Sequence, residues 1–168
     1  MIFNSEIMTA ITKYSKYFDV NPDWIRAVIE IESAGNQFAL RYEPGYRWLQ
    51  KEDTIKAICY HSNYGGNLEN KIGAETCLES FSFGLCQVMG STARDMGYVA
   101  DLHHLFFVDD NIRIGTKFLK TKLKRFDNNI LRAIAAYNGG DGSAYPNEDG
   151  NYPNQRHVDR FLKVLENQ

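Results

Sequence analysis

The sequence has little of several features that mark particular classes of protein. Three cysteines in 168 residues are too few, and too odd in number, for the framework of a small disulfide-stapled domain. No window approaches the roughly 18 unbroken apolar residues of a membrane-spanning helix, so we expect no integral membrane segment. Lys and Arg total 19 against 21 for Asp and Glu, and this lack of a basic excess argues against a nucleic-acid partner.

Signals for export and for metal binding are also missing. The first residues are interrupted by charges and contain neither an apolar h-region nor a small-residue cleavage site, so we expect no ordinary secretion signal. The four histidines follow no His-Glu-x-x-His pattern and no Cys-x-x-Cys pair is present, so we expect no metal site and no cofactor. A Cys59–Cys77 bridge and free thiols are both open, and free thiols are expected.

The composition is otherwise that of an ordinary globular domain. Hydrophobic residues make up 43% and charged residues 24% of the chain, and its length suits one domain over 1–168. Helical spacing of apolar residues predicts a mainly α fold, with at most a short β element in the 59–85 region. The predicted helices are Ser5–Phe18, Pro22–Ser33, a short one near Tyr46–Tyr60, one capped by Ser91-Thr92 and carrying Ala93, Met96 and Val99, one from Asp109 to Leu123, Asn128–Tyr137 and Gln155–Leu165.

Glu32 is the most informative single residue. On a helical wheel of Pro22–Ser33, Ile25, Val28 and Ile29 face one way, and Glu32 projects into the middle of this apolar arc. Desolvation raises the pKa of a carboxyl, and a carboxyl that stays protonated near neutral pH is able to act as a general acid. A structural role, with the carboxyl bonded to a core donor or tipped into solvent, is the alternative.

Three strings of the sequence occur together in one known family. They are Glu32-Ser33 followed by Asn36, then Gly84-Leu85-Cys86-Gln87-Val88-Met89 leading into Ser91-Thr92-Ala93, and then Ala135-Ala136-Tyr137-Asn138-Gly139-Gly140. In this order they resemble the soluble lytic transglycosylases, over nearly the whole chain. The resemblance implies a lysozyme-like catalytic domain that cleaves the glycan strands of peptidoglycan, without metal or cofactor.

The resemblance also implies roles for individual residues. Glu32 corresponds to the catalytic glutamate, and Gln87 and Met89 would line the sugar-binding groove. Tyr137 and Asn138 would stand near the acid and the muramic residue. The remaining expected substrate-binding residue is Ser82, in the string before Gly84. Each has an ordinary alternative: a backbone-bonded amide for Gln87, core packing for Met89, and a helix end for the Tyr137-Asn138 string.

The chain departs from the family pattern by an insertion of about 40–78. This insertion and the residue just beyond it add carboxylates, among them Glu43 and Glu79, either of which could serve a hydrolytic muramidase as a second acid. Surface acids, or partners for Arg41 or Arg47, are the simpler reading of both. The Ser-aromatic-Gly-Leu-x-Gln-x-Met-Gly string is similar to phage-type muramidases and implies a phage-associated branch.

Three further expectations concern function, assembly and the route to the cell wall. The third candidate, beside transglycosylase and hydrolase, is a non-catalytic glycan-binding or structural module. We expect a monomer, or a component of a phage particle or secretion apparatus. Without a signal peptide, the chain would reach the cell wall by another route, such as release from the host cytoplasm or carriage on a virion.

Overall fold

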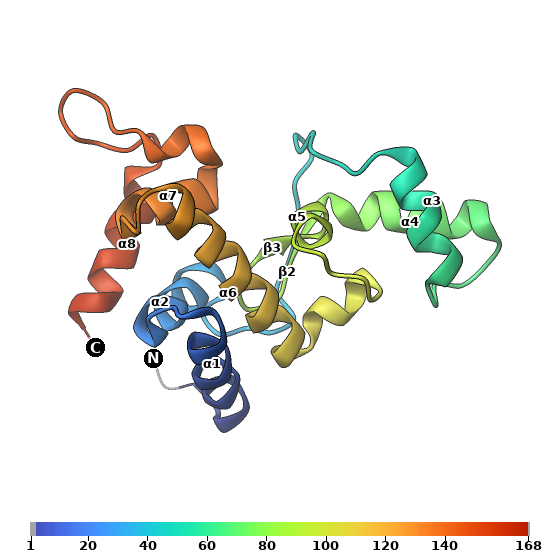
Figure 1. Ribbon diagram of the computed structural model, residues 1–168, viewed down its shortest axis with the longest axis horizontal. Coiled ribbons are helices and arrows are strands. Elements are labelled where there is room, and N and C mark those ends of the chain that lie inside the picture. The colour runs from blue at the N-terminus through green and yellow to red at the C-terminus, as the bar shows by residue number, and fades with distance from the viewer. Residues whose placement is uncertain (1–2, 168) are drawn as a thin grey trace.

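The computed structural model describes residues 3–167 and consists mainly of helices around a small sheet (Figure 1). The mainly α class expected from helical periodicity is confirmed. The helices are α1 Ser5–Phe18, α2 Pro22–Ser33, α3 Glu52–His61, α4 Leu68–Glu79, α5 Gly90–Asp95, α6 Val108–Arg125, α7 Ile130–Gly139 and α8 Gln155–Glu166. The strands are β1 Leu40–Tyr42, β2 Phe81–Phe83 and β3 Val88–Met89, and two 3-10 turns are η1 Leu102–Phe106 and η2 Asp141–Ala144.

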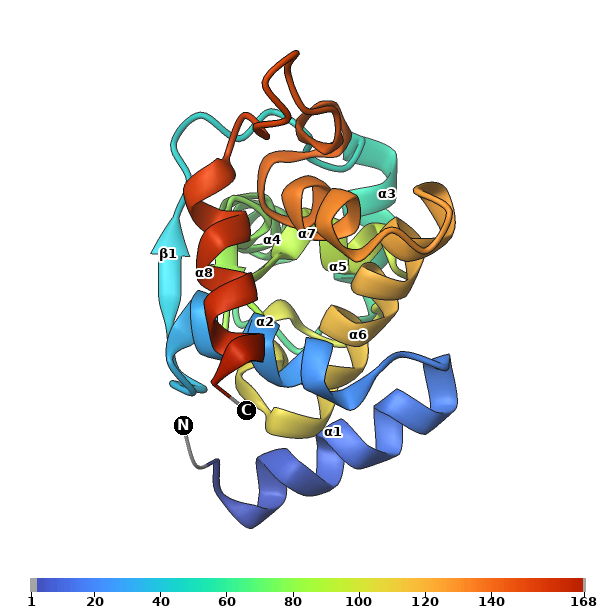
Figure 2. The same ribbon diagram turned by 90° about the vertical axis from the view of Figure 1, so that its left-hand side faces the viewer.

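The helix that carries Glu32 begins and ends as the sequence predicts. The side chain of Asn21 accepts a hydrogen bond from the N–H of Asp23, and Pro22 occupies the first turn, where its missing N–H is harmless. Ala34 and Gly35 both adopt the left-handed conformation that ends a helix. α2 then packs against α8, and the two helices lie side by side in Figure 2.

The sheet is small, antiparallel and ordered β1-β2-β3. Only β2 lies in the expected 59–85 region, since β1 lies before this region and β3 lies after it. The three residues of β1 are all exposed, so no alternation of apolar and polar residues marks it in the sequence. The turn between β2 and β3 contains the Gly84–Gln87 string, and the sheet therefore positions it.

The insertion contains two helices rather than the expected one. α3 and α4 pack together at one end of the molecule, away from α7 and α8 (Figure 1). The short helix predicted near 46–60 corresponds to α3, which begins later, at Glu52. α4 is a correction, because the sequence analysis predicts one short helix in the insertion and none over 68–79.

Two further expectations are settled around α5. Ser91 and Thr92 lie inside its first turn rather than capping it, and Val99 lies beyond the helix with 87% of its surface exposed.

All three cysteines are free thiols, as expected, with Cys59 and Cys86 buried and Cys77 exposed. Within residues 3–167, no helix combines the length and apolarity needed to cross a membrane.

Candidate active site

The carboxyl of Glu32 is almost completely removed from solvent. It lies in the last turn of α2, and its side chain is 8% exposed. Burial raises the pKa of Glu32 to about 7, while the charges of Arg41 and Arg160 act in the opposite direction. A group with this pKa holds its proton in a large fraction of molecules near neutral pH and has room to give it up.

The carboxyl of Glu32 lies beside the imidazole of His157, which comes from α8. Its Nε2 atom lies 3.5 Å from Oε1 of Glu32 and has no hydrogen-bond partner among the described residues. Burial, together with the charges of Arg160 and Arg41, lowers the pKa of His157 to about 4. The imidazole is therefore neutral at pH 7 and brings no positive charge beside Glu32.

Arg160 ties α8 to the end of α2. Its guanidinium donates a hydrogen bond of 2.5 Å to the carbonyl of Ile31, one of the carbonyls left without a helical partner at the helix end. This contact brings a cation to the negative end of the helix dipole, beside Glu32. The helix end and the acid are thus held by one side chain from a segment more than a hundred residues away.

The turn after β2 is the meeting point of three helices. From α2, Ser33 donates a hydrogen bond of 2.8 Å to the carbonyl of Leu85. From α7, the phenol of Tyr137 donates a hydrogen bond of 2.8 Å to the carbonyl of Cys86. Burial raises the pKa of Tyr137 well above its ordinary value, and the charge of Glu32 adds to this shift, so the phenol stays a donor close to the acid.

Asn111 of α6 also contacts this turn, and the sequence analysis did not identify it. Its amide nitrogen donates to the carbonyls of Phe83 and Leu105, at 2.9 and 2.7 Å, and its oxygen accepts from the N–H of Cys86 at 2.8 Å. The side chain is fully buried. A signal was present, because Asn111 lies at helical spacing among the apolar residues that form the buried face of this otherwise charged helix.

Asn111→Ala should destabilise the fold by about 3 kcal/mol, because it leaves buried carbonyl and N–H groups without partners. The free energy of unfolding in urea is the measurement. The control is Asn167→Ala, at the exposed end of α8, where we expect a change below about 0.5 kcal/mol. Equal costs for the two variants would contradict this account of the turn.

Gln87 and Ser82, predicted to bind substrate, contact each other directly. The hydroxyl of Ser82 donates to Oε1 of Gln87 at 2.9 Å, and the Gln87 amide donates to the carbonyls of Ala39 and Gly84. Gln87 itself has a positive φ of 46°. Met89 is paired with Ser82 across β2 and β3 and is half-buried. Ser82 is only 1% exposed, and the Gln87 amide has the backbone partners that its ordinary alternative required.

The other predicted residues lie in different surroundings. Asn138 is exposed at the end of α7, where its side-chain oxygen accepts from Asn154. Glu43 forms an ion pair with Arg41, the same arginine whose charge acts on Glu32. Glu43 is therefore linked to the acid through a shared cation.

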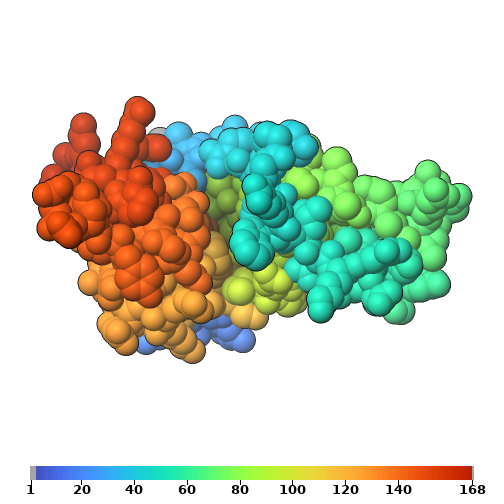
Figure 3. Space-filling model, turned by 90° about the horizontal axis from the view of Figure 1, so that it is seen from above, coloured from blue at the N-terminus to red at the C-terminus, as the bar shows by residue number. Residues whose placement is uncertain are grey.

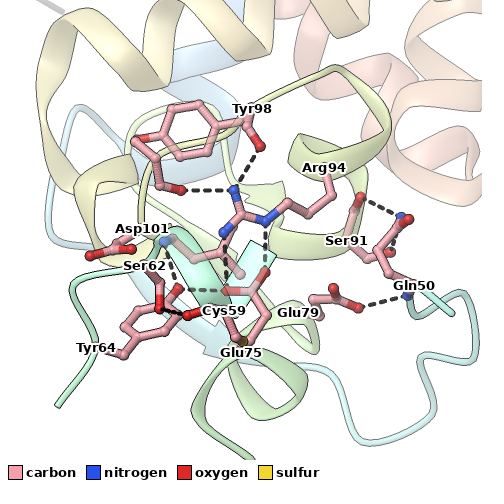
Figure 4. Close-up of polar contacts among 12 residues, drawn as sticks. Gln50, Cys59, Ser62, Tyr64, Glu75, Glu79, Ser91, Arg94, Tyr98 and Asp101 are labelled. Carbon is pink, nitrogen blue, oxygen red and sulfur yellow. Dashed lines mark hydrogen bonds and ion pairs between the residues drawn. The ribbon is translucent and has the colours of Figure 1, made fainter. Parts of the chain in front are cut away.

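Glu79 belongs to another polar cluster (Figure 4). It is completely buried, and burial raises its pKa to about 7, while the N–H of Gln50 donates to its Oε2 atom at 2.7 Å. The charges that act on Glu79 come from Glu75, Arg94 and Asp95, none of which acts on Glu32. Glu32 and Glu79, the two carboxyls with a raised pKa, thus lie in separate electrostatic surroundings.

One group of described residues could offer ligands to a metal ion. It contains Asp101, His103 and His104, whose ligand atoms lie within 4.8 Å of one another. His103 and His104 belong to the short 3-10 turn η1. The carboxylate of Asp101 already accepts from the N–H of Asn63, at 3.0 and 3.2 Å.

Comparison with known proteins identifies the family. A sequence model described as "Transglycosylase SLT domain" matches residues 9–157. The chain belongs to this family. Among solved structures, the SLT domain is similar to the X-ray structure of an inactive mutant of the lytic transglycosylase Slt from Pseudomonas aeruginosa, with a TM-score of 0.54 and 21% sequence identity. The match covers 94% of this chain and 20% of that chain.

The likeness establishes the fold of the SLT domain. The expected lysozyme-like architecture of a lytic transglycosylase is confirmed by it. The chain spans about one fifth of the length of the solved protein, so the activity of that whole protein is not transferred with the fold. Membership of the family confirms the resemblance inferred from the three strings, and assigns the chain to the transglycosylase class of enzyme.

Proposed function

We propose that this chain cleaves the β-1,4 bond between N-acetylmuramic acid and N-acetylglucosamine in peptidoglycan, without water, and leaves 1,6-anhydromuramoyl ends. The observation that carries the proposal is the buried Glu32 carboxyl, with a pKa raised to about 7, in a transglycosylase SLT domain. Such a carboxyl suits a reaction in which one group is first an acid and then a base, because its pKa lies near the working pH.

The mechanism needs one protein carboxyl used twice. Glu32 donates its proton to the glycosidic oxygen as the bond to C1 breaks, and the acetamido group of the substrate supports the positive charge at C1. The Glu32 carboxylate then takes the proton of the C6 hydroxyl as that oxygen attacks C1. The proton balance closes on Glu32, and no second protein carboxylate is required, unlike in ordinary glycosidases.

The proposed binding residues follow the geometry of the turn after β2. Gln87 and Met89, which are half-buried, would form the floor for the sugar, and the buried Ser82 would hold Gln87 in place through their hydrogen bond. Tyr137 would keep the acid desolvated while it fixes the turn through Cys86. Asn138 is exposed and would bond to the muramic residue at the rim.

Hydrolysis with a second carboxylate is the alternative. It would need Glu43 or Glu79 beside the scissile bond, about 5–9.5 Å from Glu32. Glu43 is paired with Arg41, and Glu79 is buried with its own neighbours, which favours the single-carboxyl mechanism. A non-catalytic glycan-binding module is disfavoured, because a desolvated acid gives no advantage to binding alone.

Mass spectrometry of the products decides between these possibilities. Purified peptidoglycan is digested with the wild-type chain and with Glu32→Gln. Anhydromuramoyl ends that are absent from the Glu32→Gln digest support the proposal, whereas reducing muramic ends indicate hydrolysis. If neither protein releases muropeptides, both enzymatic functions fail for this substrate and the binding module remains.

The activity should fall as the pH rises above about 7, because the first step uses protonated Glu32. Replacing Arg41 with Gln removes a charge that lowers the pKa of Glu32, so the alkaline limb of the profile should move to higher pH. The shift should be a few tenths of a pH unit, since the Arg41 side chain is 62% exposed and screened by solvent.

The pH dependence of kcat/KM on solubilised glycan strands tests this expectation. The profile is repeated in Glu79→Gln, because burial raises the pKa of Glu79 into the same range. If Glu79→Gln moves the alkaline limb and Arg41→Gln does not, the titration belongs to Glu79 and its assignment to Glu32 is wrong.

We propose further that the chain acts as one domain and as a monomer on glycan strands. An association with phage particles or a secretion apparatus stays a prediction.

A further inference from the structure

Trp48 is unusually exposed for a tryptophan. It lies between β1 and α3, inside the insertion, and 78% of its surface is accessible. Tryptophan has the largest apolar side chain and is highly buried on average, so a side chain this exposed carries a cost that the fold does not require. Trp24, the only other tryptophan, is partly buried against the core.

The segment 46–50 around Trp48 is nevertheless held firmly. The N–H of Gln50 donates to the buried carboxyl of Glu79 at 2.7 Å (Figure 4), and the Gln50 amide donates to Asp95 at 2.7 Å. These contacts attach the segment to α4 and α5 at once. A fixed backbone that presents an exposed indole is preorganised for binding, because little conformational freedom remains to be lost.

The segment is also attached next to the proposed sugar floor. The hydroxyl of Ser91 donates to the carbonyl of Trp48 itself, and Ser91 follows Met89 by two residues. The phenol of Tyr46 contacts the hydroxyl of Thr92 at 3.4 Å, in the same turn of α5. Trp48 is therefore fastened to the chain that leaves the sheet at Met89.

The space-filling view places this segment at a cleft. Figure 3 shows a hollow between the orange part of the chain, around α7 and the loop that follows it, and the cyan part that precedes α3. The cyan part corresponds to the segment between β1 and α3, which contains Trp48, and the end of α7 contains Asn138. The insertion thus supplies one wall of the hollow.

We propose that Trp48 is a glycan-binding platform, on which a sugar ring of the peptidoglycan strand packs its apolar face. The platform deepens the proposed function and rests on it, since the occupant of the cleft is taken to be a glycan strand. A pyranose ring presents C–H groups on its faces and hydroxyls at its edge, which fits an indole flanked by polar groups.

Binding is measured in a Glu32→Gln background, in which the strand is held but not cleaved. The probes are a soluble N-acetylglucosamine hexamer and insoluble peptidoglycan. Trp48→Ala should weaken binding of both about tenfold, and Trp48→Phe should recover part of the loss because the aromatic face remains. Tyr60→Ala is the matched control, since Tyr60 is 71% exposed on α3 of the same insertion, and its binding should equal that of the parent.

A spectroscopic readout isolates the indole. In Glu32→Gln/Trp24→Phe, Trp48 is the sole tryptophan, and its emission should shift to shorter wavelength as the hexamer saturates the site. The proposal is overturned if Trp48→Ala binds as the parent does, if the emission ignores bound hexamer, or if the parent binds neither probe.

The same proteins separate this proposal from the proposed function. Anhydromuramoyl products from the wild-type chain, together with unchanged binding in Trp48→Ala, would leave the function standing and reject the platform. Binding that depends on Trp48, without any cleavage by the wild-type chain, would support the platform and reject the function.

Discussion

Replacing Glu32 with Gln should abolish cleavage of peptidoglycan and, at alkaline pH, make the folded chain more stable. The loss of activity should be at least about 1,000-fold, because a positioned acid–base group contributes roughly 10²–10⁴-fold and this one serves both steps. The gain in stability has a separate cause. An ionised carboxylate with 8% exposure is desolvated without a full complement of partners, and Gln carries no charge to desolvate.

The sign of the stability effect follows from the raised pKa of Glu32. Its folded-state pKa is about 7 and its ordinary value is 4.5, so the folded chain binds a proton between these values that the unfolded chain releases. Stability is therefore fully present below about pH 4.5 and declines as the pH rises toward 7. The total loss is about 3 kcal/mol, and Glu32→Gln should remove it.

Urea unfolding at pH 5 and pH 8 measures the difference. The advantage of Glu32→Gln over the wild type should be larger at pH 8, by an amount on the order of 2–3 kcal/mol. Glu148→Gln, in an exposed loop, is the control and should show no such gain. The account of Glu32 as a buried acid fails if its variant gains nothing between the two pH values.

Breaking the ion pair between Glu75 and Arg94 should have the largest effect on stability outside the proposed site. Both side chains are buried, with exposures of 0% and 2%, and the guanidinium donates to both carboxylate oxygens, at 2.6 and 3.0 Å. Arg94 also donates to the carbonyls of Tyr98 and Ala100. Arg94→Met leaves a buried carboxylate without its cation and should cost about 3–5 kcal/mol.

The free energy of unfolding in urea at pH 7 checks this value. The matched control is Lys56→Met, which breaks the exposed Glu52–Lys56 pair of α3 and should cost less than about 0.5 kcal/mol. The double variant Glu75→Leu/Arg94→Met should recover much of the loss, since no charge is then left alone. A cost below about 1 kcal/mol for Arg94→Met would show that the pair is not the support we describe.

The prediction of a desolvated acid from the sequence succeeded because its cause is local. Residues of α2 that share a helical face with Glu32 are buried, and the wheel places the carboxyl among them. The neighbours that complete its surroundings are not local. His157 and Arg160 come from α8, and pairings between distant segments have no signature in a helical wheel.

α4 was missed for a physical reason. Its fully buried residues are Glu75 and Glu79, so it has no apolar stripe for a periodicity argument to detect. Burial of these acids depends on Arg94 and Gln50, from α5 and from the segment before α3. A sequence reading that equates burial with apolar character therefore predicts loop where a helix is present.

The insertion is also a poor candidate for excision or for transfer to another scaffold. Removing 52–79 would take away the carboxylate that neutralises Arg94 and the acceptor that fixes Gln50, and both of those partners lie outside the deleted stretch. Shortened variants would inherit an uncompensated guanidinium in the interior, and loop-swap engineering of the cleft would have to replace Arg94 in the same step.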